Sequence, residues 1–419
     1  MASNKKKSPG RVVSSAKSKA GTFGQKALRA LGVTYRSVMA LLTLALILLY
    51  MGSAWCDRLS PNVWLWFSYL SIAFPVFFFA SVIWTVVLAL LHRWKLFVLM
   101  LVAFCLTWEP VTRFWPVHAG GCAPLTEVEL PSGETLPVRV DTLSVLTYNT
   151  CWMGQTRLSK INEKIRVMDV VRNSGADIVC LQEYAFTLTP GGHTEKQLRQ
   201  SVSDIYPYYD YQHYYYRKAM GIAVFSKYPI RKAERIDRDS KSYMASMYYE
   251  IDVNGQLIAL VNNHLQTNAI NPKDRELYDD MLEHFESDSL QRLRSGVFRK
   301  LGQGFLSRAR QSNQIMRFLQ ARSERSRSLP LLIAGDFNDT PFSYCYQTIR
   351  DTLSDTWQDA GFGPGITYNR HHFWFRIDHL LHSRHLRPLQ TRVLSQYEYS
   401  DHYPVAAVFQ ILPPAAIEH

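Results

Sequence analysis

Three apolar runs in this sequence each end in side chains that bind metal ions or phosphate groups. The runs span residues 178–181, 257–261 and 332–334. Their polar ends are Gln182-Glu183, Asn262-Asn263-His264 and Gly335-Asp336-Phe337-Asn338. A short apolar run bounded by polar residues is typical of a strand buried on both faces. The three polar ends therefore predict a catalytic rim along one edge of a folded domain.

These residue types suit the hydrolysis of a phosphate ester. The reaction needs a hard cation that neutralises the developing negative charge and a positioned base that deprotonates water. It also needs hydrogen-bond donors that hold the phosphoryl oxygens. Mg²⁺ prefers one or two carboxylates together with water and substrate oxygens, and Glu183 at a strand end meets that need. The turns that carry Asp336 and Asp401 can supply the base and a further ligand.

Two histidines complete the predicted site. His264 and His402 can donate hydrogen bonds to a phosphate group, and Asp378 can fix the tautomer and charge of one of them. Each residue taken alone could have a purely structural role, because Asp and Asn favour turns and a single buried histidine is more often structural. The site would be absent only if every one of these residues were structural.

Six short motifs resemble those of the endonuclease/exonuclease/phosphatase superfamily and follow its order along the chain. That family includes deoxyribonuclease-like nucleases, apurinic endonucleases, inositol polyphosphate phosphatases and neutral sphingomyelinases. The resemblance covers about residues 140–412. The motifs are Tyr148-Asn149, Leu181-Gln182-Glu183, Asn263-His264-Leu265, Gly335-Asp336-Phe337-Asn338, Ile377-Asp378 and Ser400-Asp401-His402.

The resemblance implies an α/β fold, a four-layer α/β sandwich of two mixed β-sheets with helices outside and the site at one end. It implies that Glu183 is the principal ligand of Mg²⁺, with Mn²⁺ as an alternative, and that Asn149 and Asp401 lie near the metal. By the same resemblance, Asp336 would orient and deprotonate the attacking water, and Asn338 would help to hold the phosphate.

The resemblance also implies that His402 stabilises the charged transition state and is oriented by Asp378. His264 matches the histidine of the phosphatase and sphingomyelinase branches. Cys151 stands where some nuclease members carry an aspartate, which slightly disfavours a repair nuclease. A zinc site among the histidines at 371, 372, 379, 382 and 385 is the alternative. However, Asp378 and His379 are neighbours on a predicted strand and must point to opposite faces.

Several elements must position these residues. Strands are expected at 143–148 and 220–226, a helix over 161–171, and a hairpin that joins 243–253 to 257–261 through a type I′ turn at Asn254-Gly255. The seven tyrosines between 206 and 216 predict a surface loop, with a substrate groove as the alternative. Residues 271–319 form a polar, helical insertion whose charged blocks are expected to face solvent.

The net charge of +12 is confined to one end of the chain. Residues 1–118 hold 13 Lys/Arg and 2 Asp/Glu, so residues 119–419 hold 34 and 33. The basic excess therefore belongs to a predicted disordered tail at 1–36 rather than to a nucleic-acid surface. The six cysteines contain no CxxC pair, which leaves zinc and redox motifs unsupported.

Residues 37–118 predict a transmembrane region, followed by a linker at 119–141 and a catalytic domain at 142–412. Candidate spans lie at about 37–56, 64–91 and 95–115. The third is the weakest, because only residues 96–108 are uncharged, and it needs Glu109 and Arg113 at a membrane interface. A short re-entrant segment is the alternative.

The positive clusters of the tail and of His92-Arg93-Trp94-Lys95 predict that both stay in the cytoplasm. Three spans then make this an integral membrane protein with an extracytoplasmic catalytic domain, periplasmic in a Gram-negative bacterium. With only two spans, the catalytic domain would lie in the cytoplasm.

The expected partners are the lipid bilayer and a phosphate-ester substrate, which is a lipid headgroup, a small phosphate ester or a nucleic acid; no obligate protein partner is inferred. A lipid or small ester is slightly favoured. The alternatives are an extracytoplasmic nuclease acting on DNA or RNA and a non-enzymatic binding domain on a membrane anchor.

Overall fold

The computed structural model describes residues 34–413, apart from 119, 130–134, 138–139, 155–162, 189–192, 215–216, 238–243, 269–293 and 371–372. Nearly all of the predicted basic tail, His371, His372 and the first half of the polar insertion therefore lie outside the described residues. The chain divides into two compact units. One comprises residues 1–51 and 76–106, and the other comprises residues 52–75 and 107–419.

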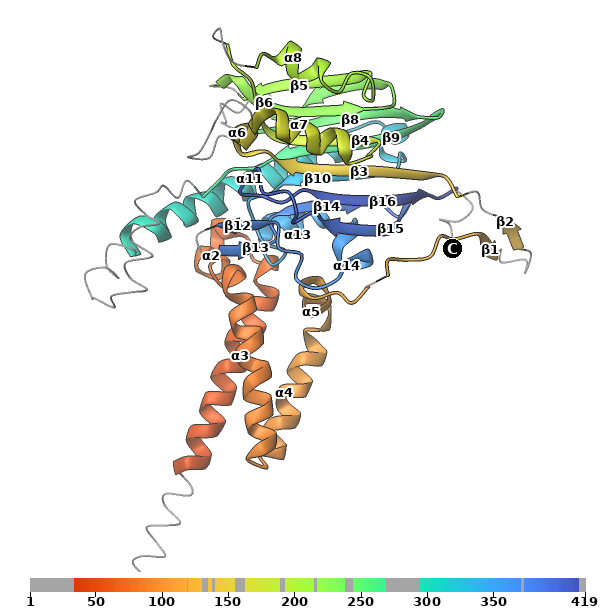
Figure 1. The fold of residues 1–419 in the computed structure, drawn as a ribbon. Helices are drawn as coiled ribbons and strands as arrows, with labels where there is room; N and C mark the ends of the chain where they lie inside the picture. The colour runs from red at the N-terminus through yellow and green to blue at the C-terminus, as the bar shows by residue number, and fades with distance from the viewer. Residues whose placement is uncertain are drawn as a thin grey trace, which may run out of the picture. The chain divides into compact units, whose positions relative to one another are not determined.

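The larger unit is built on two mixed six-stranded sheets that lie face to face (Figure 1). The strand order of one sheet is β15-β16-β3-β4-β6-β5, and that of the other is β11-β14-β10-β9-β8-β7. The first sheet comprises β3 (Thr142–Asn149), β4 (Ile178–Ala185), β5 (Tyr208–Tyr214), β6 (Arg217–Ser226), β15 (Leu386–Val393) and β16 (Val405–Ile411). The second comprises β7 (Ile230–Arg235), β8 (Ala245–Val253), β9 (Gln256–His264), β10 (Leu331–Asp336), β11 (Ser354–Asp355) and β14 (Asp378–His382).

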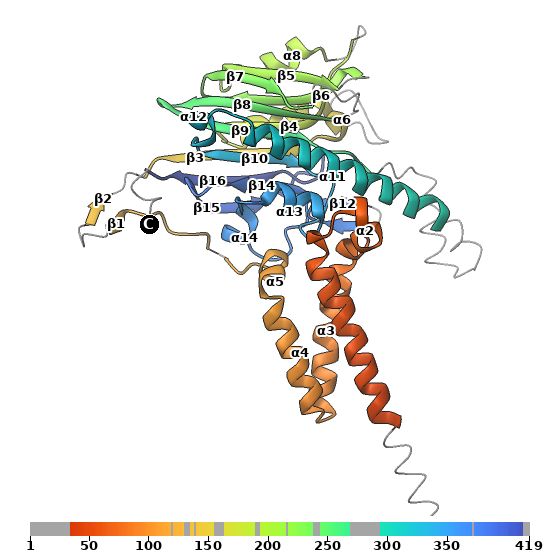
Figure 2. The same cartoon turned by 180° about the vertical axis from the view of Figure 1, so that it is seen from behind.

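Helices cover the outer faces of both sheets, which confirms the predicted four-layer sandwich (Figures 1 and 2). Those beside the first sheet are α6 (Cys151–Gly154), α7 (Glu163–Asn173) and α8 (Glu195–Gln200). Those beside the second are α11 (Arg299–Gln320), α12 (Glu324–Arg327), α13 (Tyr344–Arg350) and α14 (Thr356–Ala360). Two small hairpins pair β1 (Glu127–Glu129) with β2 (Thr135–Pro137) and β12 (Tyr368–Arg370) with β13 (Phe373–Phe375).

The apolar strands are buried on both faces, as their sequences predict. On β10, Leu332 and Ala334 pack into the core between the sheets, whereas Ile333 packs under α11 and α13. The predicted hairpin is also confirmed. Val253 pairs with Gln256, and both turn residues, Asn254 and Gly255, have the positive φ that a type I′ turn demands.

One expectation about an individual segment is wrong. Residues 208–214 of the tyrosine-rich stretch form the edge strand β5 rather than a surface loop, and the last residue of β5, Tyr214, is fully buried. On helix α11 of the insertion, Arg299 and Arg310 are exposed as expected for its basic block, whereas Arg308 is buried. Arg308 tolerates burial because its Nε donates to Asp339 Oδ2 at 2.8 Å.

Two helical segments among the described residues are long and apolar enough to cross a membrane, and each includes residues of both units. The candidate spans are Thr34–Arg58 and Pro61–Leu90, in agreement with the first two predicted spans. Helix α3 (Leu70–Leu90) carries Pro75. Helices α4 (Trp94–Leu106) and α5 (Trp108–Phe114) are bent by 68° and would make a third span only if they act together, so three spans remain a prediction.

The ends of these candidate spans belong to the larger unit. They include the short helix η1 (Cys56–Arg58), α2 (Pro61–Ser68) and α5. Arg113, which the third span would need at a membrane interface, is buried, and its Nη1 donates to Asp57 Oδ2 at 2.8 Å and to the Pro341 carbonyl. Paired carboxylates offset the cost of burying the guanidinium, since Glu109 lies 2.8 Å from Nη2.

Candidate active site

The strand pairing brings the predicted site residues to one end of the sandwich. Asp336, the last residue of β10, pairs with His264 on parallel β9 and with Asp378 on antiparallel β14. In the other sheet, Asn149 at the end of β3 pairs with Gln182 on β4, one residue before Glu183. A hydrogen bond of 2.8 Å from Asn149 Nδ2 to Asp336 Oδ2 joins the two sheets at this point.

Glu183 lies at an irregularity near the end of β4. The register of β4 with β6 shifts between Leu181 and Tyr184, and Glu183 has a φ of 52°, which is uncommon for a residue other than glycine. Thr150 stabilises this backbone, since its hydroxyl donates to the carbonyls of Gln182 and Glu183. The bulge turns the Glu183 carboxylate into the site, where its side chain stays one-fifth exposed.

Asp336 is buried and held in place by three hydrogen bonds. Besides the bond from Asn149, its Oδ1 accepts from the Asn338 backbone at 2.7 Å and its Oδ2 accepts from Asn338 Nδ2 at 3.0 Å. The preceding Gly335 is required, because its φ is 134° and a Cβ there would meet the Asn263 carbonyl at 2.0 Å. Burial raises the pKa of Asp336 to about 7, although the positive charge of His402 lowers it.

Asn338 has a φ of 52°, a conformation that asparagine tolerates better than most residues. Its Nδ2 donates to both Asp336 Oδ2 and the Leu265 carbonyl, so both amide hydrogens are used. Orienting Asp336 is therefore the role that the contacts of Asn338 support, and binding of the phosphate by its side chain remains a prediction.

His402 and Asp378 form the expected carboxylate–imidazole pair. His402 Nδ1 lies 2.8 Å from Asp378 Oδ2, and His402 Nε2 lies 3.9 Å from Asp336 Oδ2. Although burial opposes the charged form, the carboxylates of Asp378 and Asp336 raise the pKa of His402 to about 10. His402 is therefore a cation at neutral pH, with its Nε2 hydrogen available to a substrate oxygen.

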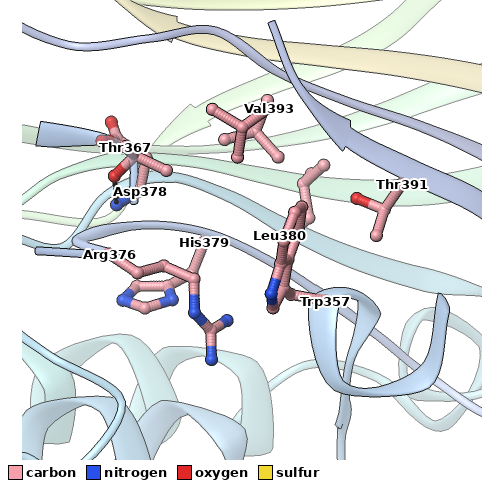
Figure 3. A pocket seen from close by; sticks show the side chains of 9 residues that line it. Trp357, Thr367, Arg376, Asp378, His379, Leu380, Thr391 and Val393 are labelled. Carbon is pink, nitrogen blue, oxygen red and sulfur yellow. Dashed lines mark hydrogen bonds between the residues drawn. The ribbon is translucent and has the colours of Figure 1, made fainter. Parts of the chain in front are cut away.

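On the side of Asp378 that faces away from His402, there is no room for a substrate. Its backbone nitrogen donates to Thr367 Oγ1 at 3.1 Å, and Figure 3 shows Thr367, Arg376 and His379 around it. The cavity between them has a volume of about 10 Å³, which is close to the minimum for one water molecule. A substrate must therefore approach His402 from the side that faces Asp336.

His264 is neutral, and its tautomer follows from its neighbours. Burial lowers the pKa of His264 to about 3. His264 Nε2 lies 3.6 Å from Asp336 Oδ2 and 3.7 Å from Glu183 Oε1, and these carboxylate oxygens favour the ring proton on Nε2. Nδ1 is then the acceptor for the Tyr214 hydroxyl 2.6 Å away, and that hydroxyl also accepts from the Glu183 backbone nitrogen at 3.1 Å.

The carboxylates of Glu183, Asp336 and Asp401 give the site a donor set that fits a hard divalent cation. Burial, followed by the charges of Asp401 and Asp336, raises the pKa of Glu183 to about 7, as expected where like charges share a buried site. Asp336, Asp378 and His402 also bring ligand atoms within 4.8 Å of one another. However, Asp378 and His402 already form an ion pair with each other. The carboxylates around Glu183 therefore fit a cation better.

A cavity of about 440 Å³ opens over these residues. Its polar lining includes Asn149, Glu183, Asp336, Asp401 and His402. Its apolar lining includes residues of η2 (Arg294–Phe298) and α11 and of the segment between α2 and Pro75, together with Trp152, Phe375 and Ile377. The volume is in the range of small-molecule binding pockets.

The histidines considered for zinc do not join this site in the part of the chain that the structure describes. His379 Nε2 lies 2.9 Å from the Asp339 carbonyl, and His382 Nε2 lies 3.1 Å from Asp359 Oδ2. His379 thus points away from Asp378, as their adjacent positions on β14 require.

Sequence reasoning missed three residues that organise the site. Tyr214 stabilises the tautomer of His264, and Thr367 supports Asp378. Ser400 accepts from the His402 backbone nitrogen and donates to the Asn149 carbonyl at 2.7 Å, which ties the His402 loop to β3. The only sequence signals were the position of Tyr214 within the tyrosine-rich stretch and the place of Ser400 beside Asp401-His402.

Comparisons with known proteins identify the family of the larger part of this chain. Residues 146–402 match the model of the endonuclease/exonuclease/phosphatase family. Residues 36–114 match a domain of unknown function (DUF8431). No curated protein has a sequence that matches this chain.

Several solved structures are similar in fold. Truncated TDP2 from Caenorhabditis elegans is 17% identical over 64% of this chain and 98% of its own, with a TM-score of 0.46. The human nocturnin catalytic domain is 15% identical over 64% and 93%, also with a TM-score of 0.46. Sphingomyelinase C from Streptomyces griseocarneus is 21% identical over 64% and 99%, with a TM-score of 0.44.

Proposed function

Because this chain belongs to the endonuclease/exonuclease/phosphatase family and is a phosphoester hydrolase, we propose that it is a membrane-anchored, Mg²⁺-dependent enzyme that directs water at a phosphate ester. The observation that carries this proposal is the convergence on Asp336. Its Oδ2 lies 2.8 Å from Asn149 Nδ2, 3.6 Å from His264 Nε2 and 3.9 Å from His402 Nε2. These atoms come from four separate segments of the chain.

Glu183 would hold the cation, with Asp401 and the Asn149 amide beside it. The cation would neutralise charge on the phosphoryl oxygens. Asp336 accepts the proton of the attacking water, since its hydrogen bonds from Asn149 and Asn338 orient the carboxylate and its raised pKa suits a base near neutral pH. His402, held cationic by Asp378, donates from Nε2 to the oxygen that gains charge.

A lipid headgroup or another small phosphate ester is the favoured substrate. Residues 119–419 carry 34 Lys/Arg against 33 Asp/Glu and so lack the basic excess that the backbone of a nucleic acid attracts. His264 also supports this choice, because it matches the histidine of the phosphatase and sphingomyelinase branches in the resemblance. The two candidate spans support action at a bilayer.

A substrate panel tests this proposal. The full-length enzyme is assayed with plasmid DNA, RNA, sphingomyelin-type lipids and inositol phosphates, in EDTA and after Mg²⁺ is restored. We expect Mg²⁺-dependent release from a lipid or small ester. Degradation of nucleic acid alone would replace the favoured substrate with the nuclease alternative. Asp336→Ala and His402→Ala should abolish turnover, whereas the control His118→Ala, at an exposed position, should not.

The catalytic domain is proposed to lie outside the cytoplasm. The support is the positive charge around His92-Arg93-Trp94-Lys95 and in the first 36 residues, which favours retention of both in the cytoplasm. Two reporters are fused in turn after His419, one active only outside the cytoplasm and one active only inside it. We expect a signal from the first, whereas a signal from the second would indicate two spans.

A further inference from the structure

The catalytic cavity has an apolar part of its wall that phosphate chemistry does not require. Besides the carboxylates, its lining includes Ile72, Val297, Phe298, Leu301 and Phe305. Four of these come from α11 and from the π-helix η2 (Arg294–Phe298) that precedes it. A phosphate group gains nothing from such a wall, whereas a hydrocarbon chain is stabilised by leaving water there.

The fifth residue, Ile72, comes from a candidate membrane span. Just before it, Tyr69 packs on the α11 region: its hydroxyl donates to the Phe298 carbonyl at 2.8 Å, and its ring centroid lies 5.5 Å from that of Phe305. A Cβ on Gly302 would meet Tyr69 Oη at 2.7 Å. The close packing of these elements therefore places Ile72 in the wall.

The same segment is bound to the loop that follows the catalytic Asp336. Thr340 Oγ1 donates to the Ser71 carbonyl at 3.3 Å, and the rings of Phe74 and Phe342 stack with centroids 3.8 Å apart. Ile72 thus lies between two residues that contact this loop. Its place beside the reacting groups is a consequence of these contacts.

The candidate span that contains Ile72 is longer than a bilayer requires. Pro61–Leu90 has 30 residues, but α3 alone has 21 residues, which is about 32 Å of helix against a hydrocarbon core of about 30 Å. Helix α2 is therefore not needed to cross the bilayer, and Ile72 lies at the beginning of α3. Val63, Trp64 and Trp66 on α2 are more than half exposed, and exposed tryptophans are typical of the headgroup level of a membrane.

On the basis of the proposed phosphoester hydrolysis, we infer that this apolar wall is a subsite for the hydrocarbon chain of a membrane lipid. The lipid's phosphoester enters the polar half beside Asp336 and His402, while its chain lies along Ile72 and Leu301. Because the span itself supplies part of the wall, the substrate is taken from the bilayer surface next to the anchor.

A chain-length series tests the subsite with the full-length protein held in amphipol. The probes are alkyl p-nitrophenyl phosphodiesters with alkyl groups from methyl to octyl, used below their micellar concentrations. We expect kcat/KM to rise about fourfold per methylene until the subsite is filled, which corresponds to the transfer free energy of a buried methylene. A flat series in the wild-type enzyme would overturn the inference.

Helix α11 offers a matched pair of variants. Leu301 and Leu306 are both half-buried on α11, but only Leu301 lines the cavity. Leu301→Ser should flatten the chain-length series, whereas Leu306→Ser should leave the series as it is in wild type. Ile72→Ser is the second test and should act like Leu301→Ser. Equal slopes in Leu301→Ser and Leu306→Ser would contradict the subsite.

A binding measurement separates this inference from the proposed function. Alkylphosphonates of the same chain lengths are titrated into the wild-type protein by calorimetry, so that no turnover is needed. Affinity that rises with chain length, without hydrolysis of any ester, would contradict the proposed function and retain the subsite. Hydrolysis with no dependence on chain length in either assay would contradict the subsite alone.

Discussion

The Tyr214 hydroxyl lies 2.6 Å from Nδ1 of His264, and this contact stabilises the tautomer that carries the imidazole proton on Nε2. The same hydroxyl accepts from the backbone nitrogen of Glu183 at 3.1 Å. One phenol at the end of an edge strand therefore orients both a proposed phosphate donor and a proposed metal ligand.

We expect Tyr214→Phe to lower kcat about fivefold, because the hydrogen bond to His264, with a net contribution of about 1 kcal/mol, is lost and the proton on Nε2 is no longer secured. Steady-state kinetics on the hydrolysed ester measure this effect. Tyr208→Phe, on the same strand but 39% exposed, is the control and should behave as wild type. Equal kcat values for the two variants would remove the proposed role of Tyr214.

The pH dependence of turnover should follow His402. Its pKa is raised to about 10, so its proton is retained through neutral pH and lost as the pH rises through that value. The alkaline limb of kcat/KM is expected near pH 10 in wild type. Asp378→Asn should move that limb toward the ordinary histidine pKa of about 6.5, because the neighbouring negative charge is removed.

The same shift links the stability of the fold to pH. A raised pKa in the folded state contributes stability that is fully present below about pH 6.5 and is lost as the pH rises through about 10. Thermal unfolding of the metal-free protein should therefore show a larger alkaline loss in wild type than in His402→Gln. An identical loss in both would mean that His402 is not charged in the folded protein.

Mg²⁺ affinity should depend on Glu183. Glu183→Gln is expected to raise the Mg²⁺ concentration for half-maximal activity by at least about tenfold, because Mg²⁺ binds carboxylate oxygens in preference to amides. Glu324→Gln, the same change at an exposed position of α12, should leave that concentration unchanged. Titration of Mg²⁺ into the EDTA-treated enzyme gives the comparison, and equal midpoints for the two variants would place the cation elsewhere.

The buried pair of Arg113 and Asp57 should be important for stability. Both side chains are about 1% exposed and lie 2.8 Å apart. Asp57→Asn leaves the guanidinium with less compensating charge, so we expect a loss of about 3 kcal/mol in the free energy of unfolding. Asp204→Asn breaks the exposed pair with Arg172 and should cost less than about 1 kcal/mol. Similar losses in thermal unfolding would contradict this assignment.

Local sequence predicted the strands because their apolar runs obey simple periodicity. The runs before Glu183, His264 and Asp336 are β4, β9 and β10, and Asn254-Gly255 is the turn that its composition predicts. The tyrosine-rich stretch was misinterpreted, because an edge strand with partly buried aromatic residues has the composition of a loop that packs on a surface. The ion pair of Arg113 was not predicted, because its partner Asp57 is 56 residues away.

The sequence by itself determined the class of fold, the candidate residues and the apolar spans, because each depends on residue type and on near neighbours along the chain. Only the tertiary structure decided how these residues meet. Register between strands places Asp336 opposite both His264 and Asp378, and packing between segments far apart in sequence places Tyr214 behind His264 and Ile72 in the wall of the cavity. Such contacts depend on distance in space, which no local pattern of residues encodes.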